Sequence, residues 1–258
     1  MVQALLFGAI ASSALLIGAA VGLRFRLPER VLAAMLAFAA GALITALAFE
    51  LFEDSYERGG IWRAAIGMAV GAGVFTLLSY LLDRYAEGKR EQSHGSEKLD
   101  VDAAASDKAA SSASVSGAAG LALLGAVTLD GIPENIALGV SLGEESGGLA
   151  LLAAIFVSNF PEALVGSASM REQGRSAGYI MGLWGICSVL LTLAVALGAG
   201  PLANADPTTL SLPLAFAAGA VLASLADTLM PEAYAKGGPA VALSTAAGFL
   251  LSFVLSTL

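Results

Sequence analysis

Long apolar runs without charge dominate the chain, and short polar segments separate them. Eight intervals are candidate membrane spans, at residues 1–23, 31–49, 64–82, 118–142, 146–170, 176–205, 207–226 and 237–258. Only two of them contain charged residues: Asp130 and Glu134 lie in 118–142, and Glu162 lies in 146–170. A helix needs about 20 apolar residues to cross the hydrocarbon core of a bilayer. The pattern predicts an all-α membrane protein with eight transmembrane helices.

One longer polar segment divides the chain. Residues 1–82 contain the first three predicted helices, and residues 117–258 contain helices four to eight. Between them, residues 83–116 are rich in Ser, Ala, Asp and Lys and have no aromatic residue after Tyr85, which predicts a flexible cytoplasmic loop. We expect one transmembrane domain overall.

The basic residues predict the orientation. With the N-terminus outside, eleven of the thirteen Lys and Arg residues fall on the inner side, and only Arg58 and Arg63 fall outside. The first apolar span has no basic residue before it, unlike a signal peptide, so we expect it to be retained. The prediction is a multi-pass protein of the cell inner membrane with both termini outside.

Composition supports a membrane protein and excludes some partners. Hydrophobic residues make up 57% of the chain and charged residues only 13%, about half the share in a soluble domain. The net charge of −8 argues against a nucleic-acid partner. The single cysteine, Cys187, excludes a disulfide framework and a cysteine-clustered zinc site. Glycine-rich helix faces are compatible with a homodimer.

An internal repeat links the second and seventh spans. The sequence Leu-Ala-Phe-Ala-Ala-Gly-Ala occupies residues 36–42 and again 214–220. The same register pairs Leu47 with Leu225, Leu51 with Leu229, Tyr56 with Tyr234, and Gly59-Gly60 with Gly237-Gly238. Because the two spans are five crossings apart, they point in opposite directions. Inverted repeats are typical of secondary transporters, whose substrate binds near the membrane midplane. We therefore expect a 3+2+3 arrangement.

A second repeat lies in spans four and five. Pro133-Glu134 is repeated as Pro161-Glu162, 28 residues later. Each proline removes a helical hydrogen bond and favours a kink. A polar residue lies four positions before each Glu, on the same helix face, and an asparagine flanks each face. The candidate ligands are Asp130, Glu134, Asn135, Ser158, Asn159 and Glu162.

Charge in these two spans favours a cation site. A carboxylate at the bilayer centre costs about 2.5–3.5 kcal/mol on the most lenient scale. Neither span contains a Lys, Arg or His that could offset Asp130, Glu134 and Glu162. The carboxyls are therefore protonated or hold a cation between them. Clustered oxygen ligands are typical of a divalent metal site.

Acidic residues at the ends of two spans suggest where such a cation enters and leaves. Glu50 ends span two on the outer side, followed by further acids, and Asp227 ends span seven on the inner side. An acidic mouth raises the local cation concentration. Our hypothesis is that Glu50 helps to collect the ion and that Asp227 helps to release it.

These motifs resemble the ZIP (Zrt-, Irt-like protein) family of divalent metal transporters. Pro133-Glu134 and Pro161-Glu162 look like the metal-binding core of that family, and residues 214–232 resemble its seventh helix. The resemblance implies eight spans, outside termini, metal binding by Glu134 and Glu162, and ligand positions at Asp130, Ser158 and Asn159. It also implies transport of divalent cations into the cytoplasm without enzymatic activity.

The chain departs from the family pattern at several ligand positions. The residue four before each Glu is usually His in the family, whereas Asp130 and Ser158 stand there in this chain. Gly131 replaces a usual Asn, and Asn135 replaces a usual Gly. The sixth span often supplies another Glu, and residues 176–205 contain no acid, so the number of metal sites stays open. Zinc is the first choice from the resemblance; manganese, iron and cadmium are alternatives, since an oxygen-rich shell suits harder ions.

Two other classes remain open at this point. A ZIP-like sensor or scaffold would bind metal without transporting it. An intramembrane aspartyl protease would need two facing aspartates, for which Asp130 and Asp227 are the candidates, but Ala226-Asp227-Thr228 lacks the Gly-x-Gly-Asp pattern of such enzymes.

Overall fold

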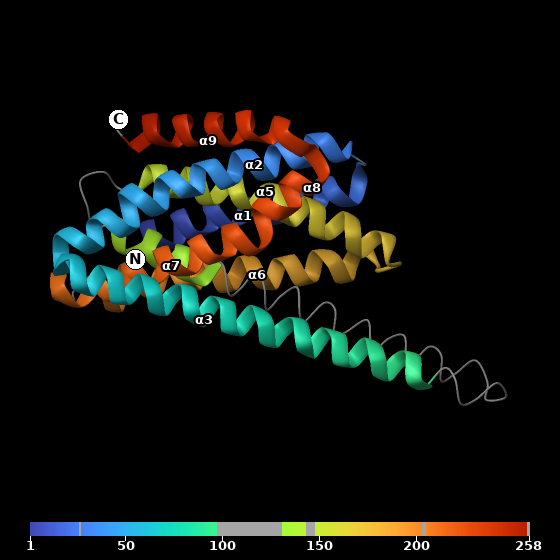
Figure 1. The fold of residues 1–258 in the computed structure, drawn as a ribbon, viewed down its shortest axis with the longest axis horizontal. Helices are drawn as coiled ribbons and strands as arrows, with labels where there is room; N and C mark the ends of the chain where they lie inside the picture. Colours follow the sequence, from blue (N-terminus) through green and yellow to red (C-terminus); the bar gives the residue numbers. More distant parts are fainter. Residues whose placement is uncertain (26, 97–130, 143–147, 203–204, 257–258) are drawn as a thin grey trace.

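The computed structural model describes residues 1–25, 27–96, 131–142, 148–202 and 205–256, and no strand occurs among them. The helices are α1 (Val2–Arg24), α2 (Glu29–Ala46), α3 (Glu53–Ser96), α5 (Leu149–Glu172), α6 (Ala177–Leu197), α7 (Pro207–Ser224), α8 (Met230–Gly237) and α9 (Val241–Ser256) (Figure 1). Residues 131–141 form a further helix, called helix 131–141 below. The expected all-α class is confirmed for the described residues.

Among the residues that the structure describes, five continuous helical stretches are long and apolar enough to cross a membrane, by length and composition. Three of them are 23, 24 and 26 residues long, which suits a single crossing. The other two, Glu29–Leu81 and Pro207–Ser256, are 53 and 50 residues long. Each of these long stretches folds back on itself: α2 and α3 run in opposite directions, as do α7 and α9 (Figure 1). The chain is thus a helical membrane protein.

The reversals occur at glycine because the backbone there is left-handed. Gly60 has φ 76° and Gly238 has φ 62°, a region that side chains with a Cβ rarely occupy. Both glycines are the second residue of the Gly-Gly pairs that the sequence repeat matches. The repeated dipeptide therefore has the same backbone role in both halves.

The repeated segments also have matching helices. α2 and α7 are both 18 residues long, and they begin and end at equivalent positions. A π-helical segment follows each one, Leu47–Phe52 after α2 and Leu225–Leu229 after α7. π-helical turns are rare and often lie at functional sites.

Close helix contacts depend on equivalent glycines. A Cβ added at Gly41 of α2 would lie 1.9 Å from the carbonyl oxygen of Thr245 in α9. A Cβ added at Gly219 of α7 would lie 2.0 Å from the carbonyl oxygen of Met68 in α3. Small residues that let backbones approach are typical of helix packing in membranes. Each contact thus joins a helix of one half to a helix of the other half, at equivalent positions.

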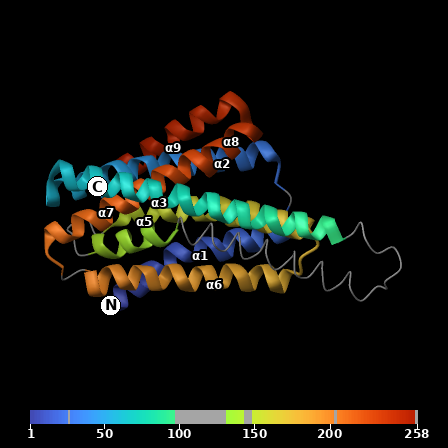
Figure 2. The same cartoon turned by 60° about the horizontal axis from the view of Figure 1, so that its bottom comes forward.

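Helix 131–141 and α5 lie within the bundle. The largest apolar cluster joins them to α2, α7 and the π-helical segments through residues such as Leu43, Leu138, Ile155 and Leu214. A second cluster joins α5 to α1 and α6. In Figure 2, α8 and α9 lie on one side of the bundle and α1 and α6 on the other, with α5 between them. The two Pro-Glu motifs therefore lie on interior helices.

One boundary differs from the sequence prediction. The flexible cytoplasmic loop was expected to begin at residue 83, but α3 continues to Ser96. Residues 83–96 contain many strong helix formers, including Ala, Glu, Lys, Arg and Gln, and no proline to end the helix. The rest of that loop, 97–116, lies outside the described residues.

Candidate functional site

The candidate site is built on a pair of connected helices. Gly148, which precedes α5, packs against Ser141 and Leu138 at the end of helix 131–141. At 1.5 Å per residue, Glu134 lies about 10 Å from this junction along its helix and Glu162 about 21 Å along α5. Ser158 and Asn159 lie between these two depths, at about 15–17 Å. Counted along its own helix, each glutamate thus lies several residues away from the junction, and Glu162 lies near the middle of the 24-residue α5.

Four of the predicted ligands are buried. The exposed fraction is 3% for Glu134, 0% for Asn135, 4% for Ser158 and 3% for Asn159. Glu162 is half-buried and interacts electrostatically with the Cys187 thiol of α6. Side chains of this polarity are rarely buried without a structural or functional partner.

The short hydrogen bonds at the site are local to each helix. Asn135 Nδ2 donates to the carbonyl oxygen of Gly131 at 2.8 Å, and Ser158 Oγ donates to that of Ile155 at 3.0 Å. Two amide atoms, Asn135 Oδ1 and Asn159 Nδ2, are buried and have no hydrogen-bond partner among the described residues. Because an amide can be turned over with little change in shape, either asparagine could present an oxygen to a cation.

The structure does not bring every predicted ligand together. Asp130 lies outside the described residues. Within the part of the chain that the structure describes, no group of three or more His, Cys, Asp or Glu side chains is arranged to hold a metal ion. Such a group could not include Asp130, and the amide and hydroxyl candidates Asn135, Ser158 and Asn159 are not among these residue types. Their role as ligands therefore stays a prediction.

The two predicted mouth residues lie in the π-helical segments. Glu50 is half-buried within Leu47–Phe52. Asp227 is exposed within Leu225–Leu229, and its Oδ2 accepts a hydrogen bond of 2.9 Å from Ser79 Oγ of α3. The sequence predicts the acids but not the π-helical geometry that contains them.

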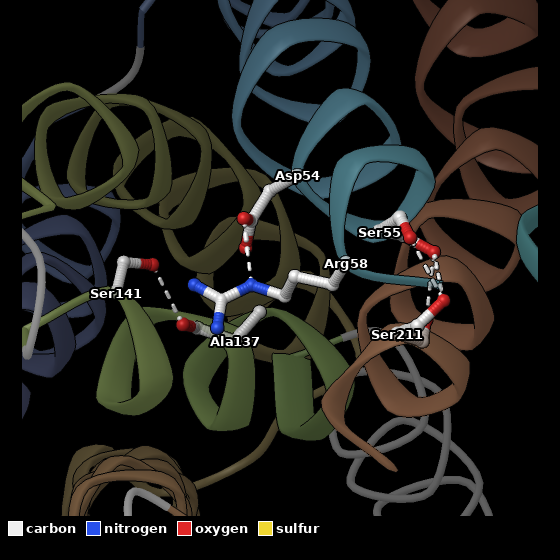
Figure 3. A network of polar contacts seen from close by, with 6 residues as sticks. All are labelled: Asp54, Ser55, Arg58, Ala137, Ser141 and Ser211. Atoms are coloured by element: carbon white, nitrogen blue, oxygen red, sulfur yellow. Dashed lines mark hydrogen bonds and ion pairs between the residues drawn. The ribbon is translucent and has the colours of Figure 1, made fainter. Parts of the chain in front are cut away.

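A group of polar contacts lies beside helix 131–141 (Figure 3). Arg58 Nε contacts Asp54 Oδ1 at 2.7 Å, and its guanidinium points toward Ala137. Nearby, Ser55 Oγ donates to the Ser211 carbonyl at 2.7 Å, and Ser211 Oγ donates to the Ser55 carbonyl at 2.8 Å. Sequence analysis missed both contacts. The spacing of an acid four residues before a base could have indicated the first one, but no local pattern indicates the second.

No protein-family model matches the chain, and no curated protein is similar to it. The resemblance to the ZIP family therefore depends on the residues of the motifs alone.

Proposed function

We propose that the protein transports divalent metal cations across the membrane, with the cation bound between helix 131–141 and α5. The observation that carries the proposal is a glutamate after a proline on each of two interior helices, with a buried asparagine close to each in the sequence. Asn135 Oδ1 and Asn159 Nδ2, which lack partners among the described residues, add polar atoms that a bound cation or its water could satisfy.

The architecture supports transport over a purely structural role. Counting one crossing on each side of Gly60 and of Gly238, and one for helix 131–141, gives eight spans. The equivalent bounds of α2 and α7, their π-helical segments and their glycine contacts favour an inverted 3+2+3 repeat. In transporters of that design, the substrate binds between the repeats near the midplane. The Pro-Glu pair would occupy that position here.

Electrostatics favours a cation as the substrate. Glu134 is buried, and neither its span nor that of Glu162 contains a basic residue. A carboxylate in the bilayer centre costs about 2.5–3.5 kcal/mol even on the most lenient scale, so acidic residues in these spans favour a positively charged ligand. Hard divalent ions accept the oxygen ligands that carboxylate, amide and hydroxyl groups supply. We take zinc first, with manganese, iron and cadmium as the alternatives.

The test is metal flux in proteoliposomes with isosteric substitutions. Glu134→Gln and Glu162→Gln remove the charge but keep the shape, so both variants should fold. We expect each to lower zinc flux at least tenfold. The matched control is Glu172→Gln, at the end of α5, which removes the same charge away from the site and should stay within about twofold of the wild type.

The same preparation separates transport from binding alone. Calorimetric zinc binding with no flux above that of empty liposomes would assign the chain to the sensor or scaffold class. Zinc flux at the wild-type level in both Glu134→Gln and Glu162→Gln would exclude the site as proposed. A panel of competing divalent ions then ranks the substrates.

A further inference from the structure

Two ion pairs occupy equivalent positions in the two halves of the molecule. Asp54 and Arg58 form one pair, and Glu232 and Lys236 form the other. The offset between the pairs is 178 residues, the same as in the Leu36–Ala42 repeat. Around them only a minority of residues is identical between the halves. An acid and a base are nevertheless kept at the same two places.

Local helix chemistry favours each pair. Both lie on a short helical segment between a π-helical segment and a left-handed glycine, residues 53–59 in one half and α8 in the other. The base is in the last turn, where a positive charge suits the helix dipole, and the acid precedes it by four residues. These effects explain why the pairs form. They do not explain what the pairs lie against.

The first pair lies beside the later part of a Pro-Glu helix. Arg58 reaches toward Ala137, three residues after Glu134 (Figure 3). In the other half, Ala233 of α8, the neighbour of Glu232, packs in one cluster with Val165 of α5, three residues after Glu162. Val165 is also the equivalent of Ala137 in the 28-residue repeat. The two repeats thus relate the surroundings of the first pair to those of the second.

Both pairs are in partial contact with solvent. The side-chain exposure is 20% for Arg58 and 19% for Asp54, and 30% for Lys236 and 40% for Glu232. An ion pair at this depth lies between bulk water and a buried carboxylate. A cation that moves from water to Glu134 or Glu162 would pass an acid that is already neutralised by a base.

We propose that Arg58 and Lys236 are guard residues at the two mouths of the cation path. Each base forms an ion pair with the carboxylate four residues before it. An arriving cation must displace the basic side chain from that carboxylate to pass. This inference rests on the proposed transport function. Arg58 and Lys236 each control access from one face of the membrane, and Glu134 and Glu162 bind the ion.

Transport kinetics test the inference from each face separately. Arg58→Gln should lower the KM for cation added outside about two- to fivefold, which corresponds to about 0.4–1 kcal/mol at 1.4 kcal/mol per tenfold change. It should leave the KM from the inside unchanged. Lys236→Gln should instead lower the KM for cation added inside and leave the KM from the outside unchanged. The measurement uses proteoliposomes of determined orientation.

Matched controls separate a guard from a general charge effect. Arg63→Gln removes the same charge on the outer side, where Arg63 donates to the Thr208 carbonyl rather than to an acid. Arg175→Gln serves for the inner side, where Arg175 stacks on Tyr179. Equal kinetic changes in Arg58→Gln and Arg63→Gln would overturn the guard role while leaving the proposed function intact.

Thiol accessibility tests the same inference without any transport. Ser141 is 6% exposed and lies beside the Arg58 network, so a Ser141→Cys variant in a Cys187→Ser background reports access past Arg58. A membrane-impermeant thiol reagent should label the introduced cysteine at least threefold faster when Arg58→Gln is added than when Arg63→Gln is added. Arg58→Lys, which keeps the charge, should restore slow labelling. Equal rates in all three variants would overturn the proposal, whatever the flux assays give.

Discussion

The contact between α2 and α9 gives the sharpest test of how the bundle is packed. A Cβ at Gly41 would lie 1.9 Å from the Thr245 carbonyl oxygen, about 1.5 Å closer than the 3.4 Å at which ordinary contact begins. The obstacle is backbone rather than a side chain that could rotate away. Gly41→Ala must therefore push the two helices apart, and overpacking of this kind costs about 1–3 kcal/mol.

The expected loss of stability follows from a comparison with a glycine whose Cβ would meet no other atom. Gly73 of α3 has no atom near the position of its Cβ, so Gly73→Ala only gains helix propensity, up to about 1 kcal/mol. Gly41→Ala has the same gain but also the clash, so it should be about 1–3 kcal/mol less stable than Gly73→Ala. For a chain of this size, that corresponds to about 2–12 °C in Tm. Thermal unfolding of the purified protein in detergent measures the difference.

The internal repeat also predicts the loss of stability for the equivalent glycine in the other half. Gly219→Ala meets the Met68 carbonyl oxygen at 2.0 Å, so its loss of stability should match that of Gly41→Ala to within about 1 kcal/mol. The reasoning is refuted if Gly41→Ala is as stable as Gly73→Ala. A large loss at Gly41 with none at Gly219 would instead refute the equivalence of the two halves.

Three further experiments test the site and its surroundings. Zinc should raise the Tm of the wild type but not that of Glu134→Gln, whereas Glu172→Gln should keep the wild-type response. Ser55→Ala and Ser211→Ala should each destabilise the protein by about 1 kcal/mol, and a double-mutant cycle that gives no coupling would contradict the reciprocal hydrogen bonds. Asp227→Asn should change the unfolding free energy by less than about 0.5 kcal/mol, since its side chain is exposed, and a larger loss in a thermal unfolding assay would show that Asp227 has a structural role.

Hydropathy and repeats predict most of the fold. The absence of charge over 31–49 and 207–226 indicates spans that the structure gives as α2 and α7 with their π-helical segments. The Gly-Gly pairs of the repeat lie where the chain reverses. These features are local, because a desolvated helix and a left-handed turn each place strict limits on the residues that can form them.

The contacts between helices are harder to predict. The sequence shows that Arg58 follows Asp54 by four residues, but not that its guanidinium points toward Ala137, because that depends on how two distant segments pack. The same holds for Ser55 and Ser211, which are 156 residues apart. At the candidate site, sequence predicts that Glu134, Ser158 and Asn159 are polar groups on interior helices. The structure adds their near-complete burial.

The π-helical segment Leu47–Phe52 has a consequence for motion. Such a segment holds about one residue more than the α-helical turns it replaces. If it relaxed to regular helix, every later side chain would rotate by about 100° and shift by about 1.5 Å relative to α2. Arg58 and Asp54 would then turn away from helix 131–141 without any hinge loop. The shape of this end of the bundle thus depends on the winding of a single helical turn.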